Sequence, residues 1–202
     1  MEKFEILVAG TGGQGVLLVG SLLEQAAQLS GHRNVIGGEI HGLSQRGGSL
    51  SKYVRIGEDV HGPIIPIGGA DLMISMELVE SVRYLDRLAK DGYIVISKTK
   101  MPSAAMWAAG ISYPKTEDIL DIIRQVTNKA VIFDAEEIAR QAGNVLTASV
   151  AILGAAVGAV PDLPILPESL KDAIKINFKD RKKLIDLNLR AFEMGMNATA
   201  RK

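Results

Sequence analysis

The sequence predicts an α/β fold in which a mostly parallel sheet lies between two layers of helices. Short β-rich apolar runs alternate along the chain with segments in which apolar residues recur at three- and four-residue spacing. This alternation is typical of parallel sheets that carry helices on both faces. The length of 202 residues fits one domain. We therefore expect a single three-layer domain over residues 1–202, with an α/β core to about residue 160 and a helical extension over 161–202.

The first third of the chain is predicted to hold three strands and one long helix. Residues 4–9 form an apolar, β-rich run that is bounded by a glycine, and further strands are expected over 34–40 and 50–56. Helical spacing marks residues 16–30, and Gly31 follows where a helix end favours a residue that can adopt a positive φ. The apolar residues with helical spacing are Leu17, Leu18, Leu22, Ala26 and Leu29.

The remainder of the chain continues the alternation. The expected strands cover 71–76, 93–97 and 130–133. The expected helices cover 78–90, 116–126, 136–142, 147–160, 168–178 and 181–198. Thr116 and Asp134 are suitable N-caps for the helices that follow them. Residues 98–115 contain two prolines and are expected to be largely irregular.

Composition argues against several classes of protein. Lys and Arg number 23 and are balanced by 23 Asp and Glu, which disfavours a nucleic-acid or membrane-surface protein. The absence of cysteine excludes a disulfide scaffold, a Cys-ligated cluster and a thiol nucleophile in this chain. Three scattered histidines give no metal-ligand spacing. No membrane span or targeting segment is visible, so we expect a cytoplasmic protein with no metal site of its own.

A glycine-rich segment follows the first predicted strand and opens the first helix. It reads Gly10, Thr11, Gly12, Gly13, Gln14, Gly15. The spacing matches the dinucleotide fingerprint of Rossmann-like folds, in which backbone N–H groups at a helix start meet an anion. Glu39 lies 24 residues after Gly15, near where such folds place a ribose-binding acid. The alternative is a turn that only allows close strand–helix packing.

A second polar, glycine-rich loop follows the second predicted strand. Its candidate ligand-binding residues are His41, Gln45, Arg46, Gly47, Gly48 and Ser49. Arg46 offers a planar fork of donors for a phosphate or carboxylate. In a parallel sheet this loop and the Gly10–Gly15 loop would share the carboxyl edge, where ligands bind. A purely structural hydrogen-bonding loop is the alternative.

No catalytic set can be assembled from the remaining residues. Glu77 and Glu80 are three residues apart, but Glu80 is also three residues before Arg83, so a surface ion pair is expected rather than a carboxylate pair. No nucleophile can be matched to a base, and no catalytic residue is assigned. The chain is not expected to be active on its own.

Four segments resemble the gamma-type subunit of 2-oxoacid:ferredoxin oxidoreductases, and within that family most resemble the beta subunit of the indolepyruvate enzymes. They are GTGGQGV (10–16), HGLSQRGGSL (41–50), the stretch over 62–85, and YIVISKT (93–99). Their order along about residues 4–160 makes the resemblance specific. Leu78 departs from it, because the family pattern has proline after the glutamate.

The resemblance implies an oxidative decarboxylation of a 2-oxoacid, such as indolepyruvate or pyruvate, with coenzyme A as co-substrate. It implies a larger catalytic partner subunit that carries thiamine diphosphate, Mg²⁺ and iron–sulfur clusters, while ferredoxin acts on the complex. The two glycine-rich loops would suit the phosphates of coenzyme A, and the chain could self-associate when alone. Two alternatives stay open, namely a stand-alone dinucleotide-binding dehydrogenase and a structural assembly module of the complex.

Overall fold

The sheet of this protein has six strands in the order β2-β3-β1-β4-β5-β6. It is seen in a computed structural model that describes residues 3–42, 47–102, 106 and 108–200. The strands are β1 (Phe4–Thr11), β2 (Val35–His41), β3 (Ser49–Ile56), β4 (Ala70–Ser75), β5 (Leu88–Ser97) and β6 (Ala130–Phe133).

Most of the sheet is parallel, as the sequence predicts, but one strand is reversed. Strands β1, β4, β5 and β6 are parallel neighbours, whereas β3 is antiparallel to both β1 and β2. The reversal follows from the connection between β2 and β3, which spans only residues 42–48. A parallel neighbour needs a crossover of a dozen or more residues, so this short connection forms a hairpin.

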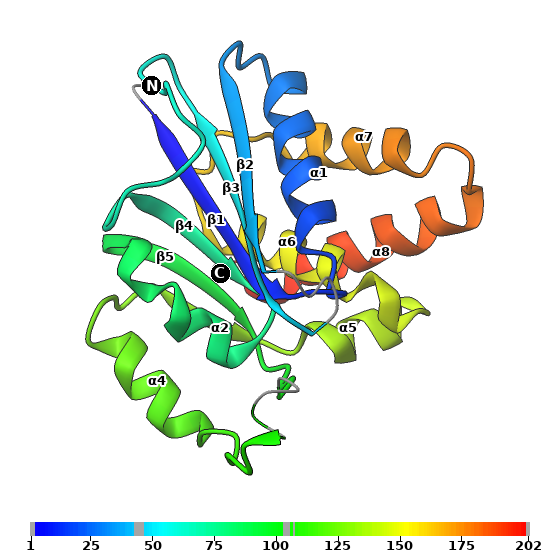
Figure 1. Cartoon of the computed structure of the whole chain (residues 1–202). Coiled ribbons are helices and arrows are strands. Elements are labelled where there is room, and N and C mark those ends of the chain that lie inside the picture. The colour runs from blue at the N-terminus through cyan, green and yellow to red at the C-terminus, as the bar shows by residue number, and fades with distance from the viewer. Residues whose placement is uncertain (1–2, 43–46, 103–105, 107, 201–202) are drawn as a thin grey trace.

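Helices cover both faces of the sheet, which confirms the predicted α/β class (Figure 1). One face carries α1 (Val16–Leu29), α5 (Ala135–Ala142), α6 (Ala148–Ala159), α7 (Pro167–Asn177) and α8 (Lys182–Thr199). The other face carries α2 (Leu78–Arg83) and α4 (Thr116–Arg124). Strand β1 serves both cores, because Ile6 and Val8 face the first group while Leu7 and Ala9 face the second.

The predicted helix over 78–90 is wrong in its second half. Helix α2 ends at Arg83, a 3-10 turn covers Leu85–Arg87, and β5 begins at Leu88. Leu88 is buried and pairs with Ala70 of β4. Periodicity alone does not separate a short apolar helix segment from a buried strand, and here pairing with β4 prevails.

Two of the three predicted helix ends agree with the structure. Gly31 adopts a φ of +94° just after α1. Asp134 caps α5, with its carboxylate accepting from Glu137 N at 3.0 Å. Thr116, in contrast, is the first residue of α4, whose cap position is Lys115.

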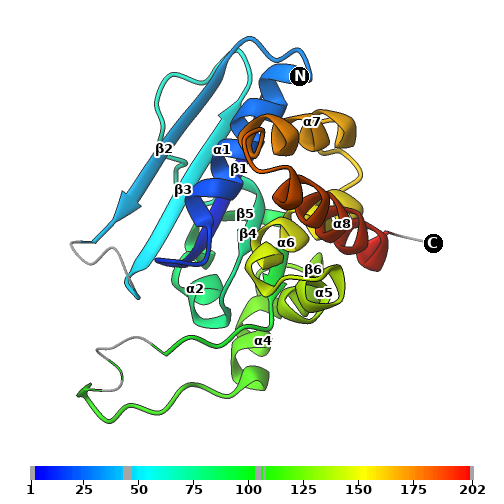
Figure 2. The same cartoon turned by 90° about the vertical axis from the view of Figure 1, so that its right-hand side faces the viewer.

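The C-terminal helix α8 is packed directly on α6, so residues beyond 160 join the main core (Figure 2). A Cβ added at Gly195 would lie 2.0 Å from Ala151 O, and one at Gly154 would lie 2.0 Å from Phe192 O. Glycine therefore sets the close approach of the two helices. Within the described residues, no helix has both the length and the apolar character needed to cross a membrane.

Candidate functional site

The two glycine-rich loops meet at the carboxyl edge of the sheet. Gly12 N donates to Gly48 O at 2.8 Å, and Gly47 N donates to Gly12 O at 3.2 Å. The register of β1 and β3 leads to this contact, because Thr11 and Ser49 are the last pair of that ladder. The sequence predicted that both loops share this edge. The reversed strand β3, rather than direct pairing of β1 with β2, brings them together.

Left-handed backbone makes glycine necessary at two positions of the first loop. Gly13 has a φ of +105° and Gly15 a φ of +85°, a region that other residues rarely adopt. A Cβ at Gly15 would also lie 2.8 Å from Ser149 Oγ. A Cβ at Gly13 would meet no atom within 4 Å, so Gly13 faces open space.

The side chain of Gln14 fixes the shape of this loop. Its Oε1 accepts from Thr11 N at 2.8 Å, and its Nε2 donates to Met76 O at 3.1 Å. Gln14 thus ties the loop to the end of β4. Both polar atoms of the amide are hydrogen-bonded to backbone, so Gln14 positions the loop.

A groove of about 500 Å³ lies where the loops join. Helix α1 begins here directly after its N-cap residue Gly15, without a side-chain cap and without an acidic residue in its first turn. The first N–H groups of a helix lack partners within the helix, and the helix dipole adds partial positive charge. The groove therefore suits an anion. Its walls are Gly12, Gly13, Gly15, Val16, Leu17, Glu39, His41, Gly48, Ser49 and Leu50.

Many of the residues that the sequence singled out reach this groove. The groove is lined by Gly12, Gly13, Gly15, His41, Gly48 and Ser49. Gly10, Thr11, Gln14 and Gly47 do not line it, but Gln14 hydrogen-bonds to Thr11 and Gly47 to Gly12 within the two loops. Gln45 and Arg46 lie outside the described residues. Glu39 is an exposed wall residue on β2, opposite Lys52 of β3.

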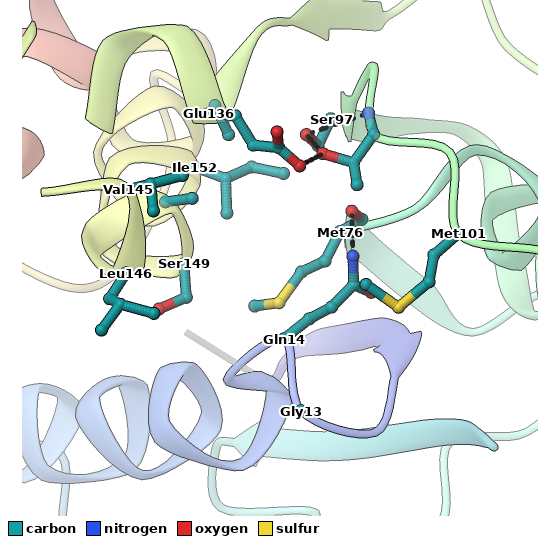
Figure 3. A pocket seen from close by; sticks show the side chains of 13 residues that line it. Gly13, Gln14, Met76, Ser97, Met101, Glu136, Val145, Leu146, Ser149 and Ile152 are labelled. Atoms are coloured by element: carbon teal, nitrogen blue, oxygen red, sulfur yellow. Dashed lines mark hydrogen bonds between the residues drawn. The ribbon is translucent and has the colours of Figure 1, made fainter. Parts of the chain in front are cut away.

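A second cavity, of about 170 Å³, adjoins the first loop on its other side (Figure 3). Besides Gln14, four polar residues line it: Ser97 and Thr99 at and just after the end of β5, Glu136 at the start of α5, and Ser149 at the start of α6. Sequence reasoning missed all four. The sequence feature that could have indicated them is their position directly after parallel strands or at a helix start. Ligands of parallel sheets bind at the carboxyl edge, where these positions lie.

Two carboxylates near this edge are buried, which corrects the expected surface pair. The ion pair exists, with Arg83 Nε 3.0 Å from Glu80 Oε1, but the Glu80 side chain is only 7% exposed. Its other oxygen accepts from Ser49 Oγ at 2.5 Å, so it holds one wall of the groove. Glu77 is 1% exposed and caps α2 through Glu80 N at 2.9 Å. The described residues contain no cluster of three or more His, Asp or Glu suited to a metal ion.

The Glu77 carboxylate has two further partners from a later segment. Its Oε1 accepts from Met101 N at 3.0 Å and from the Tyr113 hydroxyl. Burial, together with the hydrogen bond and charge of Glu77, raises the pKa of Tyr113 above its ordinary value. Glu77 thereby holds parts of the irregular segment against α2.

The fold and the site together define a Rossmann-like α/β domain with a glycine-rich loop between its first strand and first helix. The chain belongs to the pyruvate ferredoxin/flavodoxin oxidoreductase family, whose model matches residues 5–198. This confirms the resemblance to subunits of 2-oxoacid:ferredoxin oxidoreductases.

Curated relatives match almost the whole chain. The indolepyruvate oxidoreductase subunit IorB of Thermococcus kodakarensis is 39% identical, over 98% of this chain and 96% of its own length. The IorB subunit of Methanothermobacter thermautotrophicus is 38% identical, over 98% of each chain.

Solved structures share the fold at lower identity. A pyruvate oxidoreductase subunit from Thermotoga maritima superposes with a TM-score of 0.70 at 22% identity, covering 98% of this chain and 97% of that one. A 2-oxoglutarate:ferredoxin oxidoreductase from Magnetococcus marinus, solved with coenzyme A among its ligands, gives 0.69 at 16% identity. There the match covers 98% of this chain and 31% of the larger one.

Proposed function

We propose that the chain is a subunit of an oxidoreductase that decarboxylates indolepyruvate or a related 2-oxoacid with coenzyme A. In this reaction the bond between the carbonyl carbon and the carboxylate breaks, and carbon dioxide leaves. Two electrons pass to ferredoxin. The acyl carbon forms a bond with the coenzyme A sulfur, whose thiol hydrogen is released as a proton. The substrate class is supported by the indolepyruvate relatives, which are 38–39% identical over nearly the full chain.

The proposed task of this chain is to hold the phosphates of coenzyme A. The observation that carries it is the pair of hydrogen bonds between Gly12 and the Gly47–Gly48 backbone, which joins two glycine-rich loops over the start of α1. Backbone N–H groups in such a loop and at a helix start favour phosphate oxygens. Arg46, from the same loop as Gly47, would add a permanent cation.

The proposal assigns thiamine diphosphate, Mg²⁺ and the iron–sulfur clusters to a larger partner subunit. This chain has no cysteine with which to ligate a cluster. When bound, those groups supply the decarboxylation and the electron transfer. The residues of this chain contribute the binding of the co-substrate and a surface for assembly.

The alternative of a stand-alone dinucleotide-binding dehydrogenase is less favoured by the geometry. Dinucleotide folds place the strand with the ribose-binding acid beside the first strand. Here β3 lies between β1 and β2, so Glu39 is displaced by one strand spacing, about 4.8 Å.

The experiment compares Arg46→Ala with the unmodified chain after assembly with the thiamine-containing partner. Ferredoxin reduction that depends on the 2-oxoacid is measured at varied coenzyme A. The apparent KM for coenzyme A is expected to rise by about one to two decades, the scale of one lost charge-assisted hydrogen bond. The isolated chain is expected to show no turnover.

The control is Arg33→Ala, which removes an exposed arginine just before β2, at the opposite end of the sheet. It should leave the KM unchanged. If Arg46→Ala changes neither KM nor kcat in a normally assembled complex, the phosphate contact is wrong. If the complex fails to assemble, the loop serves the partner interface instead.

A further inference from the structure

Gly13 separates two cavities with different chemistry. It lines both the groove at the start of α1 and the smaller cavity beyond it, and a Cβ there would find no atom within 4 Å. Figure 3 shows Gly13 and Gln14 on one side of the smaller cavity, with Glu136 and Ser97 across from them. A ligand that lies over Gly13 can therefore reach both cavities.

The smaller cavity presents hydrogen-bond acceptors, of which Glu136 also pairs with Arg140, whose Nη2 lies 3.3 Å from Glu136 Oε2. Thr99 Oγ1 donates to Glu136 Oε1 at 3.1 Å, and the Ser97 and Thr99 hydroxyls are 2.9 Å apart. Each carboxylate oxygen accepts more than one hydrogen bond, so Glu136 keeps acceptor capacity for a ligand. Among the described residues that line this cavity there is no Lys or Arg. The carboxylate of Glu136 lines this cavity, so groups that donate N–H or O–H are favoured here over a phosphate.

Apolar side chains form the rest of the wall. Met76, Met101 and Ile152 line it, with Val145 and Leu146 from the turn before α6. Thioethers adapt to flat or branched groups. Leu146 is 82% exposed and Val145 is 44% exposed, so this apolar rim is open to solvent. The cavity suits a neutral group that combines apolar surface with N–H donors.

We propose that the cavity around Glu136 binds the neutral, N–H-donating part of the ligand whose phosphates occupy the groove beside Gly13. This inference rests on the proposed function, which places coenzyme A in that groove. Two parts of coenzyme A have the required chemistry. The adenine ring carries an amino group, and the pantetheine arm carries two amide N–H groups and a branched dimethyl carbon. Glu136 accepts from either, while the methionines cover its apolar surface.

The test measures binding to the full chain and to its complex with the partner by calorimetry. The probes are adenosine 3′,5′-bisphosphate, 4′-phosphopantetheine and inorganic pyrophosphate. One of the first two should bind more tightly than pyrophosphate, which identifies the occupant. Glu136→Gln should weaken that probe by about tenfold, since an amide oxygen is a poorer acceptor than a carboxylate. It should not weaken pyrophosphate.

Glu137→Gln is the matched control. Glu137 is the next residue of α5, is half exposed, pairs with Arg140 and does not line the cavity. A second variant, Ala148→Met, fills the cavity from the first residue of α6 and should abolish the preference over pyrophosphate. Circular dichroism verifies that each variant is folded. If Glu136→Gln does not fold, the affinities of Ala148→Met for the organic probe and for pyrophosphate test the proposal.

The outcomes separate the two proposals. If neither organic probe binds better than pyrophosphate, or if Glu136→Gln and Ala148→Met leave both affinities unchanged, the cavity proposal is overturned while phosphate binding stands. If an organic probe binds with the expected dependence on Glu136 while pyrophosphate does not bind, the cavity proposal is supported and the phosphate site is wrong.

Discussion

Tyr113 donates its phenol hydrogen to the buried carboxylate of Glu77, and the same carboxylate oxygen accepts from Met101 N at 3.0 Å. The other oxygen caps α2 through Glu80 N. One carboxylate therefore joins the start of α2 to two points of the segment after β5, at Met101 and at Tyr113. Its full set of donors satisfies a charge that would otherwise be costly to bury.

The Tyr113–Glu77 contact predicts a loss of stability at alkaline pH. Burial first, and Glu77 second, raise the folded-state pKa of Tyr113 above its ordinary value of about 10. The stabilisation is fully present below that value and is lost as the pH rises toward the folded-state pKa. Urea unfolding should show a stability that falls above about pH 10.

Tyr113→Phe isolates this effect. Near neutral pH it should lower the free energy of unfolding by about 1 kcal/mol, because Glu77 loses a donor at a half-buried site. Above about pH 10 the difference between the two proteins should shrink. A difference that stays constant across this range would contradict the assignment.

Asp71 predicts a substitution that stabilises the protein. Burial raises its pKa above the ordinary value of about 3.9, and the charge of Glu5 adds to this effect. The folded state therefore favours the protonated acid, and this contribution is lost as the pH rises through the folded-state pKa. Asp71→Asn should add about 0.5–1 kcal/mol at neutral pH, a modest value because the site is half exposed.

The backbone contact at Asp71 need not be lost in this variant. Glu5 N donates to Asp71 Oδ2 at 2.8 Å, and an asparagine oxygen can accept in its place. Urea unfolding should show the gain shrinking as the pH approaches about 3. Asp162→Asn, at an exposed position, should show no such dependence. Destabilisation by Asp71→Asn at neutral pH would refute the argument.

Gly195 predicts a severe packing defect. A Cβ at this position would lie 2.0 Å from Ala151 O, so α8 would have to move away from α6. Gly195→Ala should lower the free energy of unfolding by about 3 kcal/mol, despite the better helix propensity of alanine. Thermal unfolding measures it against Gly62→Ala, where a Cβ has open space. Equal melting temperatures for the two variants would show that the helices relax.

Local signals in the sequence were sufficient for much of the framework. Some features depend only on residues that are close in the sequence, so the local pattern predicts the structure there. Examples are the glycines at 13 and 15, the helix cap Asp134 and the apolar run of β1. The meeting of the two loops was also predictable, because β1 and β2 end at the same edge.

Features that depend on distant partners were not predictable in this way. The spacing of Glu77, Glu80 and Arg83 is that of an exposed helix face, yet both glutamates are buried. Their burial comes from Ser49 and Tyr113, which arrive from segments about 30 residues away on either side. The cavity at Glu136 likewise gathers residues from five separate stretches of chain, of which only the glycine-rich loop has a motif of its own.

The hairpin of β2 and β3 has an evolutionary consequence. The two strands that it connects lie at one edge of the sheet, so the number of residues between them can change without altering the parallel strands β1, β4, β5 and β6. Doubling a loop costs only about 0.6 kcal/mol in closure entropy. Gly15, in contrast, combines a positive φ with a close Ser149 side chain, so a residue with a Cβ would be strained there. A change in the length of this connection would therefore alter the rim of the groove at Gly48 and Ser49 and leave the rim at Gly13 and Gly15 in place.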